Sequence, residues 1–100
     1  MQDDKPNSEK LAAATIFFTG KVPGGDFNKY AIENADHLSL TGYGETLPDG
    51  WFKIYAEGEK SSVQSLIGYL EMSSAFHKVD HVQVAWSDYK GQYSGFSIKE

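Results

Sequence analysis

Apolar residues recur along the chain with two different periods. A period of two, in which apolar side chains take alternate positions, runs through residues 13–22, 51–57 and 79–88 and predicts three strands rich in β-branched and aromatic residues. Residues 39–46 form another predicted strand, which two glycines weaken, and residues 95–100 form a short final strand. Together these segments supply one small sheet.

A period of three to four residues marks two helices. Residues 26–38 and 58–74 carry apolar side chains at spacings of three and four, which places them on one side of a helix. Asp26 is the predicted N-cap of the first helix and Ser61 or Ser62 that of the second, because short polar side chains accept hydrogen bonds from free N–H groups. The predicted buried stripe of the second helix is Val63, Leu66, Ile67 and Leu70.

The order of these elements predicts the fold. The sequence "LPDG" at residues 47–50 combines proline with Asp-Gly, which predicts a tight turn between the second and third strands. The elements then follow as strand, helix, strand, strand, helix, strand, with one additional terminal strand. This is the split β-α-β order of an α+β, ferredoxin-like fold. Right-handed crossovers place both helices on one face of an antiparallel sheet of four to five strands and leave the other face open.

Length and charge limit the range of functions. One hundred residues suffice for a single domain, which we place at residues 14–100 after a polar, disordered tail at residues 1–13. The net charge is −5 and the chain has no basic run, which argues against nucleic acid and anionic membrane surfaces as partners. No apolar run reaches the roughly 18 residues that a membrane-spanning helix needs.

Residues that could support redox or metal chemistry are scarce. The sequence lacks cysteine, which excludes disulfides, thiolate catalysis and cysteine-ligated metal centres. His77 and His81 have the spacing of a metal pair on a helix, but on a predicted strand they would stand roughly 13 Å apart. Glu57 and Glu59 are interpreted as a solvated pair beside the second helix. We therefore expect no metal and no cofactor, and a cytoplasmic location.

Several stretches of the chain resemble the acylphosphatase family. "GKVPGGDFN" at residues 20–28 is similar to the family's phosphate loop, Gly-Arg-Val-Gln-Gly-Val-x-Phe-Arg, and "GYGETLPDG" at residues 42–50 is similar to Gly-Trp-Val-x-Asn-x-x-Asp-Gly. "AEG" before the second helix and "GFSIKE" at the end resemble the family's Glu-Gly and its closing strand. These stretches occur in the family's order, so the resemblance runs from about Thr15 to Lys99 and implies the same ferredoxin-like fold.

The resemblance implies a site built from a phosphate loop and two side chains. In the family, an arginine at the end of the loop clamps the acyl phosphate, and an asparagine at the end of the second strand orients the attacking water. These positions fall at Asn28 and Thr46, so both catalytic side chains are substituted. The phosphate loop comprises Lys21, Val22, Pro23, Gly24, Gly25, Asp26 and Phe27. Within it, Pro23 lacks an N–H donor and Asp26 places a carboxylate at the helix N-terminus.

These substitutions leave three functional hypotheses. The sequence favours a catalytically degenerate acylphosphatase-like domain with a binding or structural role, because a phosphate dianion needs a charged clamp that Asn28 cannot supply. The alternative is a working or weak acylphosphatase, in which Lys21 and the loop amides hold the phosphate while the carboxyl–phosphate bond is hydrolysed. The third is a cation-binding domain with Asp26 and Glu45 as ligands. Whether the chain is an enzyme stays open at this point.

Large aromatic side chains are predicted on the face of the sheet that the helices leave open. Phe17, Trp51 and Tyr55 alternate with the residues expected to face the helices. Aromatic pairs across neighbouring strands stabilise a sheet, which is one explanation. The other is a candidate partner face for a protein or a second copy of the chain. We expect a monomer or a weak homodimer, with a small anion or a protein as partner.

Overall fold

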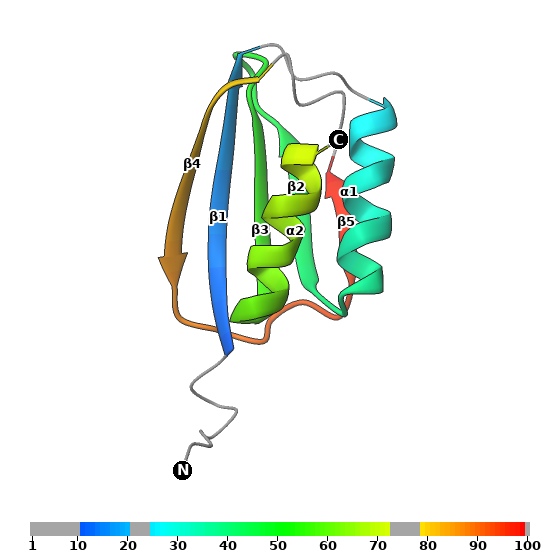
Figure 1. The fold of residues 1–100 in the computed structure, drawn as a ribbon, viewed down its shortest axis with the longest axis vertical. Helices are drawn as coiled ribbons and strands as arrows, with labels where there is room; N and C mark the ends of the chain where they lie inside the picture. The colour runs from blue at the N-terminus through cyan, green and yellow to red at the C-terminus, as the bar shows by residue number, and fades with distance from the viewer. Residues whose placement is uncertain (1–10, 21–24, 73–78, 100) are drawn as a thin grey trace.

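The computed structural model describes residues 11–20, 25–72 and 79–99. Within these residues the chain forms one five-stranded sheet, in the order β4-β1-β3-β2-β5, and two helices on the same face of it (Figure 1). The elements are β1 (Leu11–Gly20), α1 (Gly25–His37), β2 (Thr41–Thr46), β3 (Phe52–Glu59), α2 (Lys60–Met72), β4 (Val79–Ser87) and β5 (Phe96–Lys99). The predicted α+β, ferredoxin-like order of elements is confirmed.

The last strand departs from the expected antiparallel arrangement. β1 pairs antiparallel with β3 and β4, and β2 pairs antiparallel with β3. β5 instead pairs parallel to β2, from Gly42↔Phe96 to Glu45↔Lys99. β4 ends and β5 begins at the same end of the sheet but on opposite edges (Figure 1). Residues 88–95 must therefore cross from one edge of the sheet to the other.

The first strand begins earlier than expected. β1 starts at Leu11, and Leu11, Ala12 and Ala13 pair with Glu59, Gly58 and Glu57 of β3. Residues 11–13 therefore belong to the sheet and not to a disordered tail, because the apolar run that precedes the alternating pattern has a partner strand to pair with. Residues 1–10 of the expected tail lie outside the described residues.

The two helices begin before their predicted caps. α1 begins at Gly25 and α2 at Lys60, so Asp26, Ser61 and Ser62 lie inside the first turns and do not cap them from outside. In α2 the physical reason is that β3 runs directly into the helix, which leaves no intervening residue for the expected cap. Neither helix in the described part of the chain is long and apolar enough to cross a membrane.

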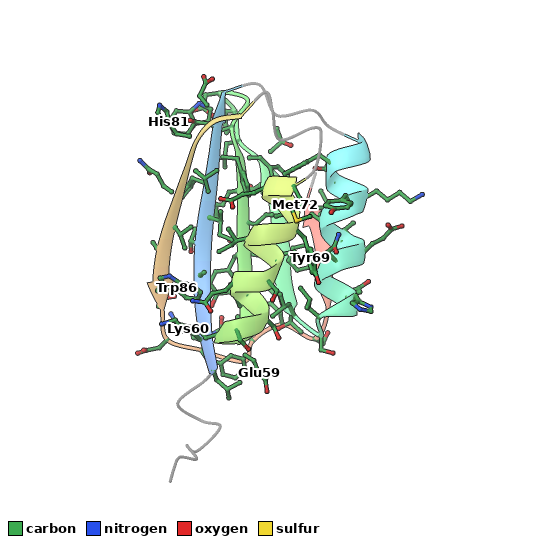
Figure 2. The ribbon with its side chains drawn as sticks, viewed as in Figure 1. Glu59, Lys60, Tyr69, Met72, His81 and Trp86 are labelled. Carbon is green, nitrogen blue, oxygen red and sulfur yellow. The ribbon has the colours of Figure 1, made fainter. Side chains whose placement is uncertain are left out.

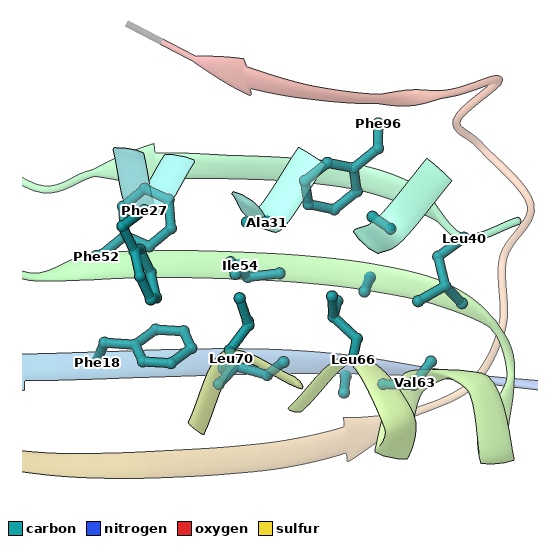
Figure 3. Close-up of a cluster of buried hydrophobic side chains, with 14 residues drawn as sticks. Phe18, Phe27, Ala31, Leu40, Phe52, Ile54, Val63, Leu66, Leu70 and Phe96 are labelled. Atoms are coloured by element: carbon teal, nitrogen blue, oxygen red, sulfur yellow. The ribbon is translucent and has the colours of Figure 1, made fainter. Parts of the chain in front are cut away.

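The hydrophobic core lies between the helices and the sheet (Figure 3). At one end, Phe18 of β1, Phe27 of α1 and Phe52 of β3 form an aromatic cluster with ring centroids 5.6, 5.8 and 6.2 Å apart. Ile67 of α2 is partly buried against this core. The rest of the predicted stripe of α2 is fully buried, as expected: Val63, Leu66 and Leu70.

The two glycines of β2 are required by close packing. Gly42 has a φ of +141°, and a Cβ at this position would collide with the carbonyl oxygen of Tyr55. A Cβ on Gly44 would lie 2.8 Å from the ring of Phe52 and 2.8 Å from the side chain of Ile98. The glycines that weaken the strand pattern in the sequence are thus what allows β3 and the core to approach β2.

Candidate functional site

The predicted phosphate loop connects the end of β1 to the start of α1. Gly20, with a φ of +100°, ends β1, and Gly25 begins α1. The first N–H groups of a helix have no partners within the helix and attract anions, so the position suits a phosphate. The other predicted loop residues, Lys21, Val22, Pro23 and Gly24, lie outside the described residues, and their roles stay predictions.

Phe27 fixes the first turn of α1 over the sheet. Its side chain is fully buried, and its ring meets those of Phe18 and Phe52 edge-on at 5.6 and 5.8 Å (Figure 3). Such edge-to-face contacts between buried rings stabilise one arrangement of the elements that carry them. Phe27 therefore fixes the first turn of α1 to the core, and its part in the phosphate loop stays a prediction.

The two predicted catalytic positions lie at the same end of the sheet. Asn28 follows Phe27 on the first turn of α1 and is half-buried, whereas Thr46 ends β2 and is exposed. Thr46 pairs with Phe52, whose ring contacts that of Phe27. The start of α1 and the end of β2 both lie at the upper end of the molecule in Figure 1. The side chains of Asn28 and Thr46 can each donate and accept hydrogen bonds, but both are neutral and cannot offset the charge of a phosphate.

A tight turn fixes the end of β2 that carries Thr46. The N–H of Gly50 donates to the carbonyl of Leu47 at 2.9 Å, and the N–H of Leu47 donates to the carbonyl of Trp51 at 2.7 Å. The N–H of Trp51 also donates to Oδ1 of Asp49 at 3.1 Å. The turn predicted at residues 47–50 is confirmed, and it gives Thr46 a defined position on a rigid hairpin.

The sheet face opposite the helices, called the outward face below, carries a row of charges. Glu45 of β2 pairs with Lys53 of β3 on one side and with Lys99 of β5 on the other. Both ammonium groups lie over the ring of Tyr43, 5.4 and 3.9 Å from its centroid. Side chains alternate along a strand, so this row points away from the helices.

The cation-binding hypothesis stays a prediction. Glu45 points outward, away from the face that α1 covers, and the side chain of Asp26 lies outside the described part of the structure. Among the side chains that the structure describes, no group of three histidine, aspartate or glutamate residues could hold a metal ion.

The outward face is partly covered by the chain itself, contrary to the expectation of an open face. Tyr55 stacks on Tyr43 with ring centroids 5.9 Å apart, and Tyr93, from the β4–β5 connection, lies 5.6 Å from both. Tyr55 is half-buried beneath this contact, Phe17 is half-buried on β1, and Trp51 is exposed at the hairpin. Aromatic packing accounts for Tyr55, while a partner role for this face stays a prediction.

Glu57 is not the solvated side chain that the sequence predicts. It is fully buried on the outward side of β3, whereas Glu59 is exposed. Its Oε2 accepts hydrogen bonds from the hydroxyl of Tyr55 at 2.7 Å and the N–H of Lys90 at 3.1 Å, and its Oε1 accepts one from the N–H of Gly91 at 3.0 Å. Burial and, secondly, the hydrogen bond to Glu57 raise the pKa of Tyr55 above its ordinary value.

Sequence reasoning missed both Glu57 and Tyr93 for one physical reason. The alternation along β3 correctly placed Lys53, Tyr55 and Glu57 on the outward face. Because that face was expected to be uncovered, Glu57 was expected to be solvated. The segment that covers Glu57 has the sequence "DYKGQYSG", which carries turn residues and no period. A two-residue alternation can predict the face of a sheet, but it carries no information about an irregular segment that crosses it.

The edge strand β4 carries His81, one of the two histidines whose spacing was considered as a metal pair. His81 is exposed near the start of the strand, and Trp86 is 40% exposed near its other end (Figure 2). The Nζ atom of Lys60 lies 5.1 Å above the ring of Trp86. His77 lies outside the described residues, so the expected separation of the two histidines stays a prediction.

The fold and the candidate anion site together define an α+β domain of the ferredoxin-like class. A family model described as Acylphosphatase matches residues 14–98. A protein named acylphosphatase from Caldanaerobacter subterraneus is 38% identical over 80 residues, which cover 80% of this chain and 89% of that protein. A second, from Methanococcoides burtonii, is 29% identical over 92 residues, covering 92% and 96%.

A solved structure agrees with this match. The crystal structure of an acylphosphatase from Bacillus subtilis has a TM-score of 0.79 and 30% sequence identity to this chain, covering 90% of this chain and 99% of that one. The family model spans most of the sequence, and the relatives match over nearly their whole length. The chain therefore belongs to the acylphosphatase family, which confirms the family resemblance read from the sequence.

Proposed function

We propose that this protein is a weak acylphosphatase, which hydrolyses the carboxyl–phosphate bond of acyl phosphates. The observation that carries the proposal is its place in a family whose relatives, matched over most of their length, are named acylphosphatases. The geometry gives further support, since the end of β1, the start of α1 and the end of β2 lie at one end of the sheet. This replaces degeneracy, which the sequence alone favoured, as the leading hypothesis.

The proposed chemistry needs only water and the substrate. Water adds to the phosphoryl group, the carboxyl–phosphate bond breaks, and the products are a carboxylate and inorganic phosphate. The loop amides and the N-terminus of α1 would hold the phosphoryl group, with Lys21 as a point charge. Asn28 would donate a neutral hydrogen bond where the family has an arginine, and the hydroxyl of Thr46 would orient water where the family has an asparagine.

The substitutions make the proposed enzyme slow. Removing one well-placed donor from an active site lowers the rate by roughly 10²–10³. A neutral amide at Asn28 gives up the charge-assisted, bidentate contact of an arginine, and Pro23 removes one backbone donor. The effects of side chains that act together are not additive, so the total loss is smaller than the product of the single losses.

A degenerate binding domain is the second candidate, and the identities of Asn28 and Thr46 favour it. A domain that keeps the loop and the helix N-terminus but lacks a charged clamp could bind a small anion without turning it over. In that case the protein would bind phosphate, and acyl phosphate would disappear no faster than in buffer.

Hydrolysis of benzoyl phosphate by the purified protein tests the proposal. We expect turnover above the buffer rate that falls about tenfold in Asn28→Ala and in Thr46→Ala. Asn34→Ala on the same helix and Thr41→Ala on the same strand are matched controls, because both positions lie at the far ends of their elements. Turnover at the buffer rate, or turnover that all four variants retain, would contradict the proposal; the first result would favour the binding domain.

A further inference from the structure

The segment between β4 and β5 crosses the outward face of the sheet. This segment, residues 88–95, is called the strap below. β4 and β5 form opposite edges of the sheet, and the strap joins them across the lower end of the molecule in Figure 1. It contacts β3 through Glu57, and it contacts β2 and β3 through the ring of Tyr93. The strap thus lies over the central strands and does not simply pass around them.

One carboxylate provides the polar attachment in the middle of the strap. Among the described residues 88–94, two backbone N–H groups bond to the sheet, those of Lys90 and Gly91. Both donate to the carboxylate of Glu57. Gly91 has a φ of +66°, a left-handed conformation that glycine adopts without a steric penalty, and its N–H and that of Lys90 reach the same carboxylate. Two successive N–H groups aimed at one anion form the concave arrangement that binds carboxylates and phosphates in many proteins.

Aromatic contact provides the other attachment. Tyr93 of the strap lies 5.6 Å from both Tyr43 and Tyr55, and it covers the outward side of that pair. Tyr55 also donates its hydroxyl proton to Glu57 at 2.7 Å, so it belongs to both attachments. The strap continues into β5, where the carbonyl of Gly95 accepts a 2.9 Å hydrogen bond from the N–H of Gly42. That bond anchors the strap at its β5 end.

The charge of Glu57 suits a reversible contact. Every group that donates to it is neutral: two backbone N–H groups and one phenol. Glu57 lies on the face without helices, and the strap covers it there. When the strap lifts, water can solvate the carboxylate, so opening leaves no buried, unpaired charge.

We propose that the strap opens and closes over the outward face as a unit, and that the Glu57 carboxylate holds it closed. The closed state buries Glu57 and shields Tyr43 and Tyr55. The open state exposes the two tyrosines beside Lys53 and Lys99 while the core between the helices and the sheet stays folded. The strap therefore sets how far the outward faces of Tyr43 and Tyr55 are exposed to solvent.

Amide hydrogen exchange in the Glu57→Gln variant tests this proposal, with Glu59→Gln as the matched control. Glutamine keeps the shape of the side chain, but its NH₂ group must face a backbone N–H, so at least one hydrogen bond to the strap is lost. We expect exchange at Lys90 and Gly91 to be about tenfold faster or more in Glu57→Gln, with exchange at Ile16 and Ile54 unchanged. Glu59→Gln, which removes the same charge from an exposed side chain, should leave all four amides unchanged.

A second variant and a second measurement keep the test decisive if Glu57→Gln fails to fold. Tyr55→Phe removes only the hydroxyl donor, and it should raise exchange at Lys90 and Gly91 less than Glu57→Gln does. In both variants, nitration by tetranitromethane should modify Tyr43 faster than in the parent protein. Equal acceleration at strap and core amides would show that Glu57 acts on global stability alone and would overturn the proposal. Unchanged strap exchange in both variants would overturn it as well.

Discussion

Glu57 and Glu59 flank Gly58 at the end of β3, and only one of them is buried. Glu57 lies on the outward face under residues 88–95, and its two oxygens accept three hydrogen bonds. Glu59 lies beyond the covered region and faces solvent. Alternation along the strand assigns Glu57 its face, but its burial depends on a distant irregular segment. The environment of such a side chain could not be predicted from its neighbours in the sequence.

The raised pKa of Tyr55 gives a prediction for alkaline stability. Because the folded pKa is above the ordinary value of 10.0, the folded state holds this proton more tightly than the unfolded state. The resulting stabilisation is fully present below pH about 10, and it is lost as the pH rises toward the folded pKa. We therefore expect the Tm of the parent protein to fall more steeply above pH about 10 than that of Tyr55→Phe. Parallel Tm curves for the two proteins would contradict the prediction.

Phe27 should contribute strongly to stability, although it lies in the predicted phosphate loop. Its ring is fully buried and contacts Phe18 and Phe52. Truncating a buried phenylalanine to alanine costs about 3–5 kcal/mol, so Phe27→Ala should lower the free energy of unfolding by that amount in urea denaturation. Trp51→Ala is the control, because Trp51 is also aromatic but is 41% exposed. A loss below about 1 kcal/mol in Phe27→Ala would show that the ring is not anchored as described.

At the scale of elements, the sequence predicts the helices and strands whose residues follow a regular spacing. The three alternating strands, the stripe of α2 and the "LPDG" turn were all predicted from the sequence, because each depends on local spacing or turn chemistry. The caps were predicted wrongly, since Ser61 and Ser62 are favourable residues near a helix start whose true position depends on β3 running into α2. The parallel pairing of β5 with β2 could not be predicted, because it depends on where the strap leads.

Two glycines in different elements should respond oppositely to alanine. Gly42→Ala places a Cβ against the carbonyl of Tyr55 at a φ of +141°, so it should destabilise the protein by about 2 kcal/mol or more. Gly68 lies inside α2 with nothing within 4 Å of a Cβ, so Gly68→Ala should stabilise the protein by about 0.5–1 kcal/mol. Urea denaturation measures both values, and changes of the same sign would contradict the prediction.

At the scale of the whole molecule, the two proposed functional regions lie at different places on the sheet. The candidate phosphate site lies where β1, α1 and the β2–β3 hairpin meet, and the strap attaches to the sheet near the end of β3. The fold was predictable, because motif order and element order agree along the chain, whereas the phosphate site itself stays a prediction. The chemistry of the site was less predictable, because Asn28 and Thr46 alone do not say whether slow turnover or binding without turnover remains.

The central claim is that this chain keeps an acylphosphatase site weakened by two side-chain substitutions. Hydrolysis of benzoyl phosphate by the Asn28→Arg, Thr46→Asn double variant tests it most directly, since these changes return the arginine and the asparagine to the positions that the family motif gives them. We predict that kcat/KM rises by about 10² or more over the parent, with the fold unchanged by circular dichroism. A folded double variant that is no faster than the parent would show that Asn28 and Thr46 do not occupy the catalytic positions.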